Sequence, residues 1–156
     1  MKKNEKRILL GALGLLVLIQ FVPIGRHNPP VTEDVDAPAE VKSILRSSCY
    51  DCHSNETRWP AYAYVAPVSW VIAFDVHEAR DQLNFSQWDR YSENAREYVK
   101  HHAVNIVTAG EMPPRRYLIL HSDAEVTPSE LSILEEWASP KTEAEPLPEP
   151  DEGTGA

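Results

Sequence analysis

The sequence is poor in basic residues. Its 15 lysines and arginines are outnumbered by 24 aspartates and glutamates, which gives a net charge of -9 at pH 7. Several of the lysines cluster at the N-terminus, so the rest of the chain offers little basic surface for binding phosphates. A nucleic acid is therefore not expected as a partner.

The sequence also lacks runs in which apolar and polar residues alternate, and it contains no internal repeat. Alternation is the signal of a half-buried strand, whereas helical spacing of apolar residues recurs over 38–47, 67–83 and 92–107. Thr127 and Glu130 predict a capping box at the start of a last helix, whose apolar face is expected to pack on the first. The sequence therefore predicts an all-α fold.

One long apolar run is present, over residues 8–24, with Gln20 as its only polar residue. Neither a small-residue cleavage site nor a cysteine for lipid attachment follows it closely. We therefore predict an uncleaved transmembrane anchor over 8–24, preceded by a cytoplasmic N-terminus of residues 1–7. Basic residues before the run and acidic residues after it predict a single-pass protein of the bacterial inner membrane, with the remainder in the periplasm.

Composition divides the rest of the chain into three parts. Residues 25–36, rich in proline and acidic residues, predict a linker. Residues 139–156 predict a disordered, acidic and proline-rich tail. Residues 37–138 then form a domain of about a hundred residues, a size at which a bound cofactor adds considerably to the stability of a small core.

Cys49 and Cys52 are the only two cysteines, and His53 follows them directly. In an exported protein the pair could form a disulfide or serve thiol redox chemistry. A thiol oxidoreductase, however, usually places this motif after a strand of a parallel sheet, which the sequence lacks. A zinc site would need a fourth ligand, and the adjacent His101 and His102 would point in different directions on a helix.

Covalent haem attachment is the favoured interpretation of the same three residues. On a short helical turn, Cys49 and Cys52 can form thioethers with the two vinyl groups of one porphyrin. His53 then lies beneath the iron as its proximal ligand. We therefore predict one covalent haem c, with a plain disulfide or thiol motif as the alternative.

The second axial position of the iron has several candidates. Met112 is favoured, because it is the only methionine besides the initiator and lies between a helix-ending Gly110 and the prolines 113–114. An open position is also possible, and it would suit a gas binder or a catalyst. The remaining candidates are four histidines: His77, His101, His102 and His121.

Three stretches, CYDCHSNETRWPAYAYVAPVSW, EARDQLNFSQW and GEMPPRRYLILHSDAEVTPSEL, resemble the bacterial haem-binding domain family of small c-type cytochromes. The resemblance covers about residues 41–138. It implies a mostly helical fold related to class I cytochromes c, with haem bound to Cys49 and Cys52 and ligated by His53. The GEMPP segment is similar to the methionine loop of class I cytochromes, which gives the distal position to Met112.

Together these features predict a membrane-anchored monohaem c-type cytochrome that transfers single electrons in the periplasm. Its expected partners are membrane or periplasmic redox proteins, and we expect an electron carrier rather than an enzyme, with peroxidase-like activity left open. The alternative is a haem-based sensor or small-ligand-binding module whose sixth iron position is open or displaceable.

Overall fold

Helices make up the regular structure of residues 3–139, the part of the chain that the computed structural model describes, and this part contains no strand. Its only β-type contact is an isolated bridge between Glu33 and Gln87. The all-α prediction is confirmed. The α-helices are α1 (Lys3–Leu18), α2 (Ala39–Ser48), α3 (Tyr50–His53), α4 (Val68–Gln82), α5 (Glu93–Thr108), α6 (Arg115–Leu118) and α7 (Pro128–Ala138). Four 3-10 turns lie between them: η1 (Ile19–Phe21), η2 (Ala61–Tyr64), η3 (Trp88–Arg90) and η4 (Ser122–Ala124).

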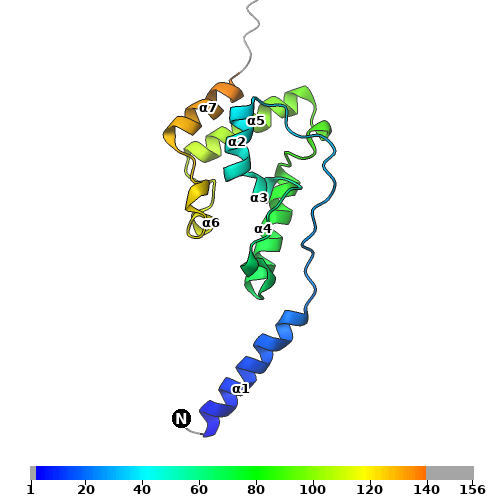
Figure 1. Ribbon diagram of the computed structural model, residues 1–156, viewed down its shortest axis with the longest axis vertical. Helices are drawn as coiled ribbons and strands as arrows, with labels where there is room; N and C mark the ends of the chain where they lie inside the picture. Colours follow the sequence, from blue (N-terminus) through cyan, green and yellow to red (C-terminus); the bar gives the residue numbers. More distant parts are fainter. Residues whose placement is uncertain (1–2, 140–156) are drawn as a thin grey trace, which may run out of the picture.

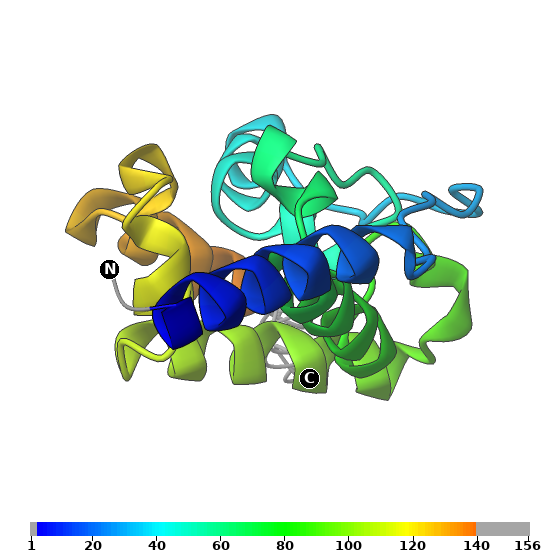
Figure 2. The ribbon, with the colours of Figure 1, turned by 90° about the horizontal axis from the view of Figure 1, so that it is seen from below.

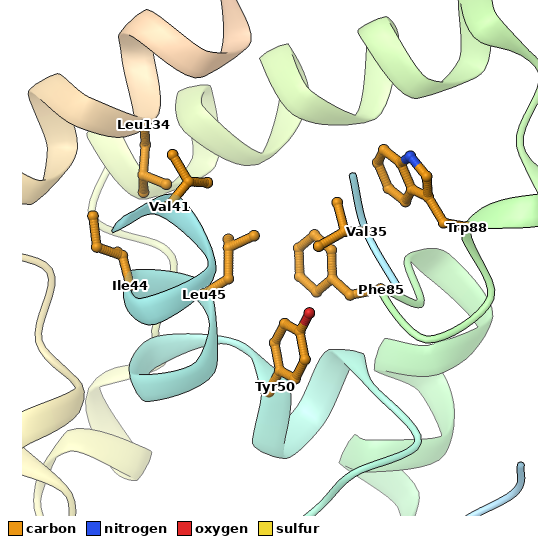
Figure 3. Close-up of a cluster of buried hydrophobic side chains, with 8 residues drawn as sticks. All are labelled: Val35, Val41, Ile44, Leu45, Tyr50, Phe85, Trp88 and Leu134. Atoms are coloured by element: carbon orange, nitrogen blue, oxygen red, sulfur yellow. The ribbon is translucent and has the colours of Figure 1, made fainter. Parts of the chain in front are cut away.

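A cluster of buried apolar side chains joins α2, α3 and α7 to the segment before α2 and the turn after α4 (Figure 3). Helix α2 supplies three of them from one face, as the spacing of its apolar residues predicts. Helix α7 packs on α2 as predicted, and it also packs on α5. The cluster consists of Val35, Val41, Ile44, Leu45, Tyr50, Phe85, Trp88 and Leu134.

The predicted capping box at the start of α7 is confirmed. The backbone N–H of Glu130 donates to Thr127 Oγ1 at 3.3 Å, and the backbone N–H of Thr127 donates to Glu130 Oε2 at 2.8 Å. These bonds satisfy backbone groups that a helix end otherwise leaves unpaired.

The segment that we predicted as a linker, residues 25–36, lies along the domain. The backbone N–H of Thr32 donates to the carbonyl of Ser86 at 3.0 Å, and that of Val35 donates to the carbonyl of Phe85 at 2.9 Å. Val35 is completely buried in the core cluster. This segment therefore belongs to the packed structure, because one apolar side chain and several backbone groups find partners in the turn after α4.

The N-terminal helix differs from the predicted transmembrane segment over 8–24. Helix α1 has 16 residues and ends at Leu18, and Val22 beyond η1 is extended. A helix of this length covers about 24 Å, less than the roughly 30 Å of a bilayer core. Within residues 3–139, no helix combines the length and the apolar character needed to cross a membrane, so the predicted transmembrane helix is not supported.

Helix α1 extends away from the domain (Figure 1). A polar contact lies at the junction between them. The side chain of Gln20 accepts the backbone N–H of Ala66 at 2.9 Å and donates to the carbonyl of Ala66 at 3.1 Å. The single polar residue of the apolar run thus holds the end of this segment against the loop before α4. Of the predicted N-terminus and tail, residues 1–2 and 140–156 lie outside the described residues.

Candidate haem-binding site

Cys49, Cys52 and His53 lie on a single helical turn. The backbone N–H groups of Cys52 and His53 both donate to the carbonyl of Cys49, at 3.1 and 2.9 Å. The turn itself continues from α2, because the N–H of Cys49 donates to the carbonyl of Leu45 at 2.8 Å. Cys52 and His53 follow Cys49 by three and four residues, a spacing at which each of their side chains neighbours that of Cys49 on a helix.

The imidazole of His53 is oriented by the backbone of α4. Its Nδ1 lies 3.0 Å from the carbonyl oxygen of Ala79 and 3.1 Å from that of Leu83. Because carbonyls only accept, Nδ1 carries the proton, which leaves Nε2 as the ring nitrogen that can bind a metal. Burial lowers the pKa of His53 despite these two hydrogen bonds, and this favours the neutral ring that a metal requires.

The environment of the two cysteines disfavours thiolate chemistry. Burial, followed by the neighbouring Cys52, raises the pKa of the Cys49 thiol to about 12. Burial, followed by the carboxylates of Asp51 and Asp75, raises the pKa of Cys52 to about 11. Both cysteines are free of disulfides. Because redox-active cysteines generally have lowered pKa values, this site does not resemble that of a thiol oxidoreductase.

The turn after α4 makes hydrogen bonds to both the backbone and the ring of His53. The backbone N–H of Phe85 donates to the carbonyl of His53 at 2.8 Å, and its ring stacks on that of Tyr50 at 5.5 Å between centroids. The buried side chain of Ser86 accepts the backbone N–H of Asn55 at 2.9 Å. The segment LNFS therefore fixes both the ring and the backbone of His53.

Arg80 is a second support of this region, and we did not identify it from the sequence. Its guanidinium donates to the carbonyl of Ser54 at 2.7 Å and to Thr57 Oγ1 at 2.8 Å, and it also reaches the N-terminal segment at Asn28 Oδ1, at 2.8 Å. The loop after His53 is thus tied to both α4 and the chain before α2. A lone arginine on a helix gives no signal of such a role, because all of its partners are distant in sequence.

Met112 lies in the bend between α5 and α6, outside any helix. Gly110 precedes it with a φ of 72°, a left-handed conformation that favours glycine, and ends α5. The Met112 side chain is 37% exposed, so it does not fill the core as a lone methionine commonly does. Met112 is thus partly exposed, on a bend between the end of α5 and Pro113.

The histidines considered as alternatives have other surroundings. His77 is exposed on α4, with its Nε2 3.7 Å from Asp81 Oδ2. His121 Nε2 lies 2.5 Å from the hydroxyl of Tyr62, and its ring stacks on Tyr117 at 4.3 Å. His101 and His102 are exposed on α5, and His102 stacks on Tyr98. Of these rings, that of His121 already has a close hydrogen-bond partner.

The residues present fit a haem better than a bare metal ion. Among residues 3–139, no group of three or more histidines, cysteines and acidic residues is arranged to hold a metal ion. The same part of the chain contains two buried side-chain polar atoms without a hydrogen-bond partner, the indole nitrogens of Trp59 and Trp70. An unpaired buried donor costs about 1–3 kcal/mol, and the propionate carboxylates of a haem are acceptors for such groups.

Comparison with known protein families assigns this chain to one of them. It matches the haem-binding domain family over residues 14–140, most of its length, and it belongs to that family. No curated protein and no solved structure matches it significantly. The matched region begins well before residue 37, in agreement with the packing of the N-terminal segment on the domain.

Proposed function

We propose that this haem-binding protein is a monohaem c-type cytochrome that carries single electrons. Cys49 and Cys52 would hold the porphyrin by thioethers, His53 would be the proximal ligand and Met112 the distal one. When bound, the haem supplies an iron that cycles between the ferric and ferrous states. The chain's own residues attach it, orient its ligands and limit the access of water.

The observation that carries this proposal is the placement of the His53 ring. Two thiols and an imidazole share one helical turn, and the backbone of α4 fixes the tautomer that exposes Nε2. In metal sites, a hydrogen bond from the other ring nitrogen to a carbonyl orients the ligating histidine and raises its basicity. A disulfide or thiol function would need no such control of the neighbouring imidazole.

We further propose that the protein works in the periplasm, held at the inner membrane by the apolar residues 8–24. Support comes from α1, where eight large apolar side chains between Ile8 and Leu18 are more than half exposed. Exposed apolar surface on this scale indicates a lipid or protein contact. Recovery of the full-length protein in the membrane fraction after an alkaline wash would support this location, and recovery in the soluble fraction would contradict it.

The partners would be membrane or periplasmic redox proteins with a basic docking face. The chain has a net charge of -9, which favours binding to a basic surface. We expect such complexes to be weak and to dissociate more readily at high salt concentration. An electron carrier of this type performs no chemistry on a substrate, so we propose no enzymatic activity.

The spectrum of the ferric protein and carbon monoxide binding by the reduced protein test the Met112 assignment. We expect the weak sulfur-to-iron charge-transfer band at the red end of the visible spectrum, and slow or absent carbon monoxide binding. A spectrum without this band, together with rapid carbon monoxide binding, would instead support a haem-based sensor with an open sixth position.

A further inference from the structure

The segment that carries Met112 has little apolar packing to hold it. No residue from 109 to 121 is buried, and Ile119 and Leu120 are 79% and 65% exposed. Helix α6, in the middle of this segment, packs on η4 and has no extensive backbone contact with α3 or α4. Figures 1 and 2 show α6 standing apart from both helices. The position of Met112 therefore depends on a few specific side-chain contacts.

The first of these contacts leads to the haem-attachment turn itself. The hydroxyl of Tyr117 in α6 donates to Asp51 Oδ2 at 2.9 Å. Asp51 lies between the two cysteines, and its Oδ1 accepts the backbone N–H and Nε of Arg58 at 3.1 and 3.3 Å. Asp51 thus joins the segment of Met112 to the turn that carries Cys52 and His53.

Two more contacts join the segment of Met112 to α4 and η2. Arg116 Nη2 donates to Asp75 Oδ2 on α4 at 3.0 Å. His121, which stacks on Tyr117, approaches the hydroxyl of Tyr62 on η2. His53 and Met112 would each hold the iron from a separate segment, so these segments need not pack directly on each other. The side chains of Tyr117 and Arg116 connect them.

We propose that Tyr117 is a positioning residue for the sixth iron ligand, acting through its hydrogen bond to Asp51. The solvent-exposed ion pair between Arg116 and Asp75 is a second contact, which joins the same segment to α4. This inference rests on the proposed function, because it takes Met112 as the ligand. Loss of the Tyr117 hydroxyl raises the population in which Met112 has left its position by roughly five-fold, the factor that corresponds to one typical hydrogen bond.

The test compares Tyr117→Phe with wild type in the full-length, haem-loaded protein. The rate of carbon monoxide binding to the reduced form should rise roughly five-fold, and the ferric sulfur-to-iron band should disappear at a lower temperature. Covalent attachment of haem should not change. Tyr98→Phe is the matched control, because it removes the same hydroxyl from an exposed tyrosine of α5 that stacks on His102. It should behave as wild type.

A charge exchange separates positioning from general destabilisation. Arg116→Asp alone should change the binding rate in the same direction as Tyr117→Phe, and combining it with Asp75→Arg should restore part of the wild-type rate. If Tyr117→Phe binds carbon monoxide at the wild-type rate while wild type shows the sulfur-to-iron band, Tyr117 has no positioning role. If wild type itself lacks the band, Met112 is not the ligand, and the proposed ligation and this inference both fail.

Discussion

At the scale of single residues, the backbone of α4 fixes the orientation of the His53 imidazole. Two carbonyls of α4 hold His53 Nδ1 at 3.0 and 3.1 Å, and a third hydrogen bond from Phe85 holds its carbonyl. The ring therefore has little freedom to turn away. Under the proposed ligation, this preorganisation would lower the entropy that the ring loses when Nε2 binds the haem iron.

Replacing Met112 should alter the iron without releasing the haem. In Met112→Ala we expect the covalently bound haem to be retained, because the thioethers and His53 are unchanged, while the sulfur-to-iron band is lost and carbon monoxide binds faster. Absorption spectra of the ferric and reduced proteins measure both changes. His77→Ala removes an exposed alternative ligand and should leave the spectra as in wild type; loss of the band in His77→Ala would contradict the assignment.

A partly buried hydrogen bond of Tyr50, next to Cys49, should make stability depend on pH. Tyr50 donates to Asp34 Oδ1 at 2.5 Å. Burial acts to raise the pKa of Asp34, but the bond from Tyr50 and the charges of Lys42 and Arg46 outweigh it and leave the pKa lowered. A carboxyl with a lowered pKa stabilises the fold above its unfolded pKa, and this contribution is lost as the pH falls through its folded pKa.

Tyr50→Phe tests this contribution. At pH 7 the free energy of unfolding should fall by about 1 kcal/mol, the net worth of one hydrogen bond. The difference from wild type should shrink as the pH falls through the pKa of Asp34, because the carboxyl is then neutral in both proteins. Urea unfolding followed by circular dichroism at neutral and acidic pH measures it. An equal difference at both pH values would contradict this role of Asp34.

The sequence predicted some residues of the candidate site and missed others for a physical reason. Cys49, Cys52 and His53 are adjacent in the chain, so their chemistry can be read from local spacing. Asp51 and Arg80 act through partners that lie far along the chain, at Tyr117 and in the N-terminal segment. Such contacts depend on tertiary packing, which no single-sequence pattern reports.

At the scale of elements, the α-helices over 39–48, 68–82, 93–108 and 128–138 agree with the predicted ones within one residue at most ends. They agree because apolar spacing, proline and the capping box act locally. The segment before α2 was predicted as a linker because prolines and acids dominate it. The residue that anchors this segment to the domain is Val35, which is completely buried. Composition alone cannot show whether a single valine is buried or exposed to solvent.

The packing of this segment predicts that Val35→Ala destabilises the domain. The substitution removes two buried methyl groups from the core cluster, which should cost about 1.5–2.5 kcal/mol. Thermal or urea unfolding of the haem-loaded protein measures the loss. Val31→Ala, an exposed position on the same segment, is the matched control and should change stability little. A loss below about 0.5 kcal/mol in Val35→Ala would indicate that the segment is a free linker.

The capping box of α7 gives a prediction about one helix end. Thr127→Ala removes the acceptor for the backbone N–H of Glu130 and should lower the free energy of unfolding by about 1 kcal/mol. Ser129→Ala, a neighbouring hydroxyl in the first turn of α7, should have a smaller effect. Equal effects of the two substitutions in urea unfolding would show that the cap is not the source of the stability.

At the scale of the whole molecule, one buried apolar cluster joins α2, α3 and α7, and large apolar side chains of α4 and α5 stay exposed. Val71 and Phe74 on α4 and Tyr98 on α5 are each more than half exposed. A domain of about a hundred residues has only a modest core, so a bound group that covers apolar surface contributes strongly to its stability. We therefore expect bound haem to stabilise the fold.

Cys52→Ser should therefore weaken the fold as well as the attachment. With one thioether lost, we expect haem to bind weakly or not covalently and much of the helical structure to be lost in the haem-free protein. Circular dichroism and thermal unfolding of the purified variant measure this. A well-folded and stable haem-free domain would contradict the structural role of the haem, although it would leave the attachment chemistry untouched.

The most direct measurement of the central claim is the state of the haem in protein produced in a host with haem-attachment machinery. After extraction with acidic acetone, we predict that one haem per chain stays with the protein, and that its alkaline pyridine spectrum is that of a haem whose two vinyl groups are both saturated by Cys49 and Cys52. Haem that passes into the acetone, or a spectrum with intact vinyl groups, would contradict the account.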